Sequence, residues 1–382
     1  MATTPPADSS TTPITNISID DLFSTTPIGS VNRAIGNNLY GINHRQVPGM
    51  VQSNKDIYGL TFFTRPQLNL QDGNIRNVRQ LYSLLTQDSQ TLQRFVRTTL
   101  DPRLMTGYQY GDDLSQSVPP IDCPLVDPEN VFIPVLTNNL NSISGWPDMV
   151  THAFTSKPGL YNEVYAQVDS TSRVFEAFDL DASFKNSRGD PIAYMFAVWM
   201  MYQSNVFEGK LVPYLDFISE NEIDYNTRIY RLVLDQTKTI VTKICCTGAS
   251  FPISLPTASF FDYSHDKPFN DQNKDIAIRF KCLGVDYFDD IVIAEFNQSV
   301  CIFNPGMRDD YRDTAMVKVN KNLIGYFNNR GYPRINPTNN ELEWYIATDL
   351  FNNRVLSMIQ KNIVTQEYID LFINNSPSDA GD

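Results

Sequence analysis

The chain has 382 residues, of which 42% are hydrophobic, 12% aromatic and 19% charged, with a formal net charge of −13 at pH 7. This composition can bury a sizeable core and excludes a disordered or collagen-like chain. Because phosphate binding needs clustered Lys and Arg, the charge balance argues against a protein that binds nucleic acid over its whole surface. It leaves open a negatively charged partner that moves past the protein without being bound.

The cysteines and the hydropathy pattern predict a reduced protein without a membrane span. Five cysteines are an odd number without framework spacing, and the neighbours Cys245 and Cys246 would point to opposite faces of a strand. A reduced, cytosolic environment during assembly is therefore expected. No run approaches eighteen consecutive apolar residues, so we expect neither a membrane span nor a secretory signal.

The first 150 residues predict a flexible arm and an N-terminal extension. Residues 1–16 are nearly all Thr, Pro, Ser and Ala, too poor in large apolar groups to become ordered unless a neighbour holds them. Residues 17–150 form the predicted helical and irregular extension, with a strand over 57–66. Two tandem helices are expected within 74–100, from the spacing of Ile75, Val78, Leu81, Tyr82 and Leu85 and then of Leu92, Phe95, Val96 and Leu100. Seven prolines make 101–150 irregular and place a domain boundary there.

Residues 151–303 predict the main β domain. Strand-like runs occupy 161–168, 172–180, 228–234, 239–246, 275–283 and 291–296. Over 276–282, large apolar residues alternate with small or charged ones, so one face of that strand is buried and the other meets water or a neighbour. A helix starting at Pro191 aligns Ile192, Met195, Phe196, Trp199 and Met200. This order predicts an α+β fold, an antiparallel β-sandwich or barrel with one packed helix.

Residues 304–382 predict a C-terminal extension. After Asn304 the pattern favours loops and a short hairpin. Two closing helices follow, one around 350–359 and one around 365–372, before a polar tail. No internal repeat at a fixed period is present.

The familiar catalytic motifs are absent, and the sequence predicts no cofactor, no metal ion and no catalytic residue. There is no phosphate-binding loop, dinucleotide fingerprint, His-Glu-x-x-His or nucleophile elbow, and the three histidines are widely spaced. One acidic loop, 262–275, leaves two interpretations open. It favours a solvated connection between strands, because its spacing matches no calcium loop and lysines dilute its charge. The remote alternative is a metal-dependent hydrolase that uses Asp262, His265, Asp266 and Asp271.

Three other clusters favour structural roles. Cys245 and Cys246 lie in an apolar strand and are interpreted as small core residues rather than redox or metal ligands. The basic cluster Arg94, Arg97 and Arg103 is interpreted as a solvated helix face paired with acids, because Asp101 interleaves it. The aromatic residues between Tyr194 and Tyr202 are typical of a helix packed on a sheet.

The stretch from Thr247 to Pro256 and the residues after it resemble those of a known protein family. This stretch, a Tyr263-bearing loop, the run 271–275 and the alternating strand that ends near Tyr287 resemble the tail-tube family of contractile phage tails and, more closely, the tube-initiating proteins of the baseplate. The resemblance covers about forty residues near 239–287. The loop at 260–274 is longer than expected and about 150 residues precede the barrel, which favours a specialised ring at one end of a tube over a simple tube subunit.

The resemblance implies a non-enzymatic virion protein of the tail, assembled in the host cytoplasm. It implies rings of identical copies, expected to be sixfold, that surround a DNA passage without binding the DNA specifically and that contact tail tube, baseplate or neck proteins but no membrane. Edge strands would pair between subunits. The alternative is a neck or connector adaptor or a tail terminator. Gly248 is expected to permit a tight turn, and the predicted assembly residues are Gly248, Pro252, Ile253, Ser254, Asp271, Asn273, Ile276, Ile278 and Phe280.

Overall fold

The computed structural model divides the chain into two compact units, Met1–Lys55 and Asp56–Asp382. The structure describes residues 58–106, 108–109, 117–118, 120–171, 174–262, 265–266, 274–320, 324–325, 327 and 330–360. The flexible N-terminal segment predicted at 1–16 and the helix predicted around 365–372 lie outside the described residues. No helix in the described part is long and apolar enough to cross a bilayer.

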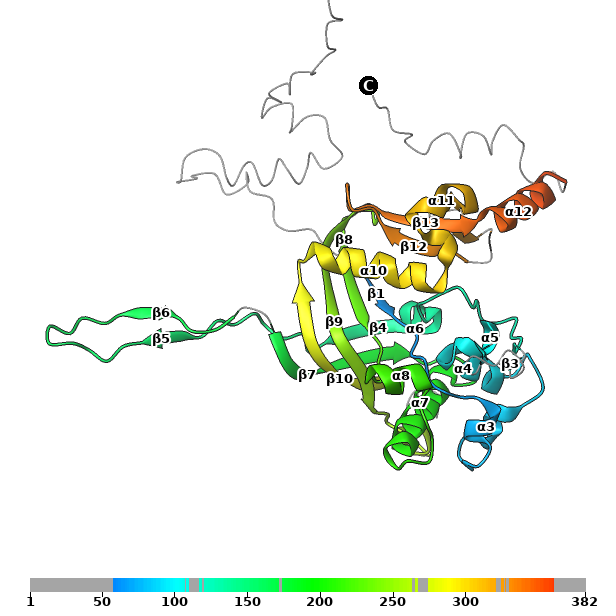
Figure 1. Ribbon diagram of the computed structural model, residues 1–382, viewed down its shortest axis with the longest axis horizontal. Helices are drawn as coiled ribbons and strands as arrows, with labels where there is room; N and C mark the ends of the chain where they lie inside the picture. The colour runs from blue at the N-terminus through cyan, green and yellow to red at the C-terminus, as the bar shows by residue number, and fades with distance from the viewer. Residues whose placement is uncertain are drawn as a thin grey trace, which may run out of the picture. The chain divides into compact units, whose positions relative to one another are not determined.

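A six-stranded antiparallel sheet, nearly closed into a barrel, forms the centre of the second unit (Figure 1). Its strand order is β1-β8-β9-β10-β7-β4. The strands are β1 (Tyr58–Phe63), β4 (Leu140–Ser144), β7 (Val174–Lys185), β8 (Ile229–Leu234), β9 (Val241–Ser254) and β10 (Asp275–Tyr287). Together with the helices around it, this sheet confirms the predicted α+β class.

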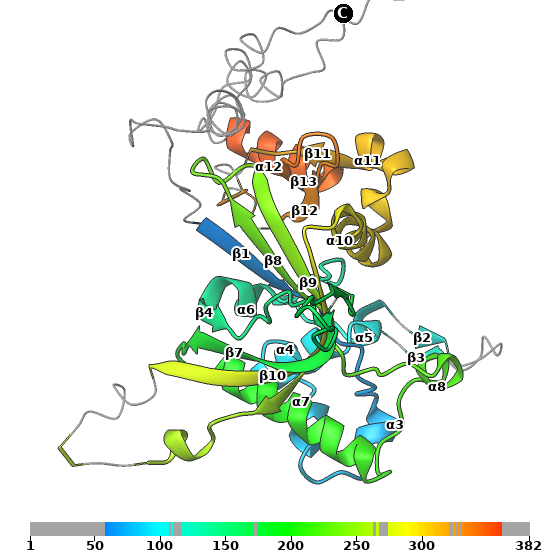
Figure 2. The same cartoon turned by 90° about the vertical axis from the view of Figure 1, so that its left-hand side faces the viewer.

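Two layers cover opposite faces of this sheet, as the turned view shows (Figure 2). The neighbours Phe62 and Phe63 point to opposite faces of β1, because side chains alternate along a strand, and each joins a different apolar cluster. On the Phe63 side lies α7 (Pro191–Phe207), the predicted packed helix, with Phe196 and Trp199 fully buried. On the Phe62 side lies α10 (Asp290–Phe303), with the small sheet β11-β13-β12 beside it.

Shorter elements surround these layers. Before the main strands come α3 (Asp72–Ile75), η2 (Tyr82–Leu85), α4 (Leu92–Leu100), α5 (Arg103–Thr106), β2 (Tyr108–Gln109), β3 (Ser117–Val118) and α6 (Pro134–Asn139). The middle of the chain adds β5 (Ala153–Thr155), β6 (Ala166–Val168), α8 (Leu215–Glu220) and η4 (Ala258–Phe260). The last part holds η5 (Pro305–Met307), α11 (Asp309–Ala315), β11 (Met316–Lys318), β12 (Tyr332–Ile335), β13 (Leu342–Ala347) and α12 (Thr348–Gln360). The β12-β13 hairpin and α12 confirm the predicted hairpin and the first closing helix.

The prediction of the first of the two tandem helices is wrong. Only α3 and η2 are helical between residues 72 and 88, while the second helix is present as α4. The backbone N–H groups of Val78, Leu81 and Leu84 each donate to the carbonyl three residues earlier, which is the 3₁₀ pattern. Ile75, Val78, Leu81 and Leu84 are therefore buried at a spacing of three, which the sequence pattern does not distinguish from a helical spacing of 3.6.

The predicted strand at 291–296 is also wrong, because these residues lie in α10. The Asp289 side chain accepts a hydrogen bond of 2.9 Å from the backbone N–H of Ile291 and caps the helix. Val292, Phe296 and Val300 are buried at intervals of four residues, the spacing of one helix face. A six-residue window on this segment is too short to separate a buried helix from a buried strand.

Candidate assembly surfaces

The predicted assembly residues lie on two neighbouring strands. Gly248, Pro252, Ile253 and Ser254 belong to β9, and Ile276, Ile278 and Phe280 belong to β10. Ile253 and Ser254 are exposed, while Pro252 is buried and the three β10 residues are at most 1% exposed. Asp271 and Asn273 lie outside the described residues. The structure thus leaves two of the described residues with substantial surface for a neighbour, Ile253 and Ser254.

The predicted turn at Gly248 is wrong. The segment is a continuous fourteen-residue strand, β9, with Gly248 in its middle. A Cβ placed on Gly248 would lie 2.6 Å from the carbonyl oxygen of Leu283 on β10. Glycine is therefore needed here for the close approach of two strands, between the pairs Leu283–Ala249 and Val285–Thr247.

The outer face of β10 and β7 carries paired charges. Along β10, buried and exposed residues alternate as predicted. On the exposed side Arg279 is 2.8 Å from Asp181, and Lys281 is 2.9 Å from Asp179. Each of these two cations on β10 therefore has an anion directly beside it on β7, so this face is electrically balanced.

The sheet has two edge strands, β1 and β4, each of which pairs with one strand among the described residues. β4 has five residues and pairs only with β7. At the end of β1 the backbone N–H of Ile133 donates to the carbonyl of Phe63 at 2.9 Å, so that part of the edge is covered. Edge strands are the places where a strand of another chain can add to a sheet.

Residues 151–171 form a β-hairpin, here called the arm, that extends away from the six-stranded sheet (Figure 1). Every residue of β5 and β6 is exposed. Its turn is closed by a hydrogen bond of 3.1 Å from the N–H of Asn162 to the carbonyl of Gly159, which places Leu160 and Tyr161 at the tip. Leu160 is 89% and Tyr161 86% exposed. The predicted strand at 161–168 is therefore shorter, since only 166–168 belong to β6 and Tyr161 lies in the turn.

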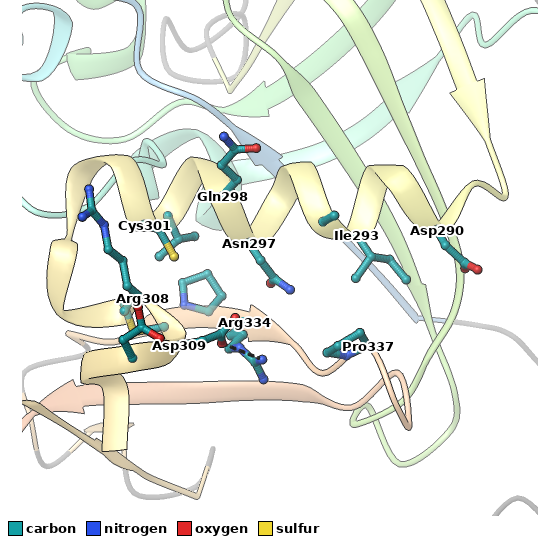
Figure 3. A pocket seen from close by; sticks show the side chains of 14 residues that line it. Asp290, Ile293, Asn297, Gln298, Cys301, Arg308, Asp309, Arg334 and Pro337 are labelled. Carbon is teal, nitrogen blue, oxygen red and sulfur yellow. Dashed lines mark hydrogen bonds and ion pairs between the residues drawn. The ribbon is translucent and has the colours of Figure 1, made fainter. Parts of the chain in front are cut away.

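A charged pocket of about 690 Å³ lies between α10, η5, α11 and β12 (Figure 3). Asp309 projects into it between two arginines, with an ion pair to Arg312 and another of 3.2 Å to Arg334. Asp290 lies at the far end of α10, and Cys301 faces the same space. The pocket therefore combines three acidic and two basic side chains with apolar ones such as Ile293 and Pro337.

A second pocket of about 570 Å³, here called the α4 pocket, is mainly apolar. Nine of its fourteen lining residues are apolar: Leu92, Phe95, Leu125, Val126, Phe132, Ile133, Pro134, Val135 and Pro191. Its charged lining residues are Arg65 and Asp127. Leu125 lies at the surface, 59% exposed, whereas Phe132 and Ile133 are buried at the base.

A buried arginine shapes the α4 pocket. The Arg65 guanidinium donates to the backbone carbonyls of Thr99 at 2.9 Å and of Asn130 at 3.2 Å, and also to those of Thr98 and Asp127. It thereby joins the C-terminal end of α4 to the 127–130 loop. Burial lowers the pKa of Arg65 to about 10, and the nearby carboxylates of Asp101 and Asp127 favour its charged form.

The interpretation of the basic cluster as a solvated helix face is wrong for Arg97. Arg97 is 1% exposed, donates to the carbonyl of Leu70 at 2.9 Å and pairs with Asp72. Arg103, in contrast, pairs with Asp216 at 2.7 Å and lies over the Tyr214 ring. Because the carbonyl that Arg97 binds lies 27 residues earlier in the chain, the signal for its burial was not local.

Asp101 is completely buried within the same cluster. Its Oδ2 accepts hydrogen bonds from the Leu70 N–H at 2.9 Å and the Tyr214 hydroxyl at 2.8 Å, while its Oδ1 has no hydrogen-bond partner among the described atoms. Burial raises the pKa of Asp101 to about 7, although these hydrogen bonds and the arginines oppose the shift. The network supports the fold around the α4 pocket and contains no nucleophile placed in a cavity.

The vicinal cysteines and the described part of the acidic loop do not form a metal-binding cluster. Cys246 is buried at 2% exposure and burial raises the pKa of its thiol to about 12, which confirms it as a core residue. Cys245 is only half-buried, so the core interpretation is wrong for it. Of the four residues of the hypothetical hydrolase site, Asp262, His265 and Asp266 are described and Asp271 is not. Among the described residues no three His, Cys, Asp or Glu side chains converge in a way that could hold a metal ion.

Seven chains of solved structures match part of this chain, among them the following three. The anti-feeding prophage tube-terminating cap is 14% identical over 41% of this chain and 82% of that chain, with a TM-score of 0.26. The sheath/tube terminator of the extracellular contractile injection system PVC, in its extended state, is 12% identical over 39% and 85%, with a TM-score of 0.23. A chain of the PVC sheath-tube complex, also extended, is 13% identical over 41% and 82%, with a TM-score of 0.24. With TM-scores this low, the three structures give no basis for inferring the fold or the role of this chain.

The sequence itself gives the decisive comparison. No curated protein matches the chain. A family model described as "Putative phage tail tube protein" matches residues 2–364, nearly the whole chain. The chain therefore belongs to this phage tail tube protein family and is a structural component of a phage tail.

Proposed function

We propose that the chain assembles with copies of itself into a ring, expected to be sixfold, at one end of the tail tube. The exposed arm carries this proposal. Leu160, Tyr161, Tyr165 and Val168 are all more than half exposed on it, and monomeric proteins rarely leave so much contiguous apolar surface in water. Contact with another subunit would remove that surface from water, which stabilises the contact by roughly 25 cal/mol for each Å² of apolar area buried.

The two edge strands offer a second route of association. Edge strands present unpaired backbone N–H and C=O groups to which a strand of a neighbour can add. In a ring, β1 or β4 of one subunit would pair with an edge of the next. Ile253 and Ser254, exposed at the end of β9, are the predicted assembly residues that we propose for a direct contact between subunits.

Genomic DNA would pass through the ring without being held. The net charge of −13 repels phosphates. The cations on the outer face of β10, Arg279 and Lys281, are already neutralised by aspartates of β7. A passage lined by this face would offer phosphates few unpaired positive charges to bind.

The position that we propose is the baseplate end of the tube, where the ring would initiate it. Beyond the central sheet the chain carries an added layer, formed by β11, β12, β13, α11 and α12. Such a layer gives the two sides of a ring different surfaces, so one side would stack on tube subunits and the other on baseplate proteins.

Two measurements test the proposal. Mass photometry and cryo-EM of the purified chain are expected to show closed rings, and cryo-EM of intact particles is expected to place one such ring at the baseplate end of the tube. A chain that stays monomeric at every concentration and is missing from virions would overturn the proposal. A ring found at the neck would replace the tube initiator by a neck adaptor or terminator.

A further inference from the structure

The tip of the arm presents side chains that a turn does not require. Asn162 has a positive φ of 60°, and the N–H of Gly159 donates to the carbonyl of Glu163 at 2.9 Å. This is the common three-residue hairpin loop, in which the third loop residue adopts the left-handed conformation. Gly, Asn, Asp and Ser are the usual residues in such turns. Leu160 and Tyr161, at its two central positions, therefore point to a role outside the turn.

The α4 pocket has the matching properties. Its volume of about 570 Å³ lies in the range of about 300–1,000 Å³ typical of pockets that bury a compact ligand. Two adjacent side chains, one aliphatic and one aromatic, are a ligand of this kind. Arg65, which lines the pocket, ties the 127–130 loop to α4 and so fixes two of its walls relative to each other.

We propose that the tip of one copy, Leu160 and Tyr161, inserts into the α4 pocket of a second copy. This inference rests on the proposed self-assembly and names its contact. Because the tip and the pocket are different surfaces, the contact is heterologous and repeats from copy to copy, closing into a ring when the rotation allows. The tip does not occupy the pocket of its own chain, since both of its side chains are almost fully exposed.

Charge and chemistry favour this pocket over the charged pocket. Lys157, near the tip, is exposed and has no ion pair with another described residue. Asp127 lines the α4 pocket and is the acid that Lys157 would meet. In the charged pocket five of fourteen lining residues are ionisable acids or arginines, which an apolar tip would have to desolvate without pairing.

The arm is long enough for such a contact and is already shaped for it. Seven residues separate Ala153 from Leu160, so the tip extends about 23 Å from the start of β5 at about 3.3 Å per residue. Hydrogen bonds along the hairpin, such as 2.8 Å from the Ser156 N–H to the Tyr165 carbonyl, fix the arm before contact. Preorganisation of this kind reduces the entropy lost on association.

A photo-crosslink tests the contact directly. Tyr161 is replaced by p-benzoylphenylalanine in the full chain, and oligomers mixed from normal and ¹⁵N-labelled chains are irradiated and analysed by mass spectrometry. We expect crosslinks between the two isotopic forms, at residues that line the α4 pocket. Crosslinks only to other surfaces, or none within existing oligomers, would overturn the inference.

Substitutions on both sides of the contact give an independent test. The tip variant Leu160→Ser/Tyr161→Ser and the pocket variant Leu125→Glu are each expected to raise the concentration for half-maximal assembly at least tenfold. Combining them is expected to add little, because they remove one contact. The matched controls Phe207→Ser and Leu215→Glu change side chains that are 93% and 51% exposed elsewhere, and are expected to stay within twofold of the unaltered chain.

The results separate this inference from the proposed function. If the unaltered chain forms rings and the tip and pocket variants form them equally well, the tip does not use the pocket, while ring formation stands. If the unaltered chain never associates and is absent from virions, both proposals are wrong. Circular dichroism of each variant checks that its fold is kept, which is expected because the substituted side chains are exposed.

Discussion

Replacing Gly248 by alanine tests the close approach of β9 and β10. The added Cβ would lie 2.6 Å from the carbonyl oxygen of Leu283, whereas an ordinary contact needs about 3.4 Å. The two strands must therefore separate locally by roughly 0.8 Å. Overpacking of this kind costs about 1–3 kcal/mol, and each weakened ladder hydrogen bond adds about 1 kcal/mol. The lower backbone entropy of the unfolded alanine chain offsets only about 0.4–1 kcal/mol.

We therefore expect Gly248→Ala to lower the free energy of unfolding by about 1–4 kcal/mol. Urea denaturation followed by circular dichroism measures this change. The matched control is Gly73→Ala in α3, where an added Cβ meets nothing within 4 Å, and it is expected to stabilise the protein by about 0.5–1 kcal/mol. If both variants are as stable as the unaltered chain, or equally stabilised, the close contact does not constrain position 248.

Three further substitutions test the buried network and the helix start. Arg65→Met leaves several buried carbonyls without a donor, so urea denaturation is expected to show a loss of about 3–5 kcal/mol, against almost none for the exposed Arg188→Met. The folded pKa of Asp101, about 7, lies above its unfolded value, so its contribution to stability is complete below pH 4 and is lost as the pH rises to 7, by about 4 kcal/mol. Asp101→Asn is expected to remove this dependence. If the variant and the unaltered chain show the same difference in the free energy of unfolding between pH 5 and pH 8, the Asp101 carboxyl group is ionised throughout that range. Asp289→Ala removes the cap of α10 and is expected to cost about 1 kcal/mol; a thermal melt identical to that of the unaltered chain would mean that the cap contributes nothing.

The sequence predicted the elements whose period is unambiguous. The helix that starts at Pro191 and the alternating strand that starts at Asp275 both appear as α7 and β10. Residues 75–84 were mistaken for a helix because a spacing of three and a spacing of 3.6 differ little over ten residues. Gly248 suggested a turn because glycine is common in turns, whereas its neighbour here is a strand more than thirty residues away.

The surfaces were less predictable than the core. Gly159 and Asn162 are turn residues, so the hairpin had a local signal that the apolar pair between them obscured. The α4 pocket had no such signal. Its shape depends on Arg65, whose hydrogen-bond acceptors lie 33 to 65 residues further along the chain. A charged residue that will be buried by distant backbone looks like any exposed arginine in the sequence.

The shared sheet has a consequence for how the protein opens. Phe62 and Phe63 belong to different apolar clusters on the two sides of one sheet. If one layer separates from the sheet, the strand β1 is still packed against the other layer. Backbone amides where β1 pairs with β8, at Phe62–Tyr230 and Phe63–Ile229, would then exchange with solvent only when both layers have separated, while the amides of the arm, which neither layer covers, exchange sooner. A subunit built in this way can loosen its contact surfaces during assembly without loosening its centre.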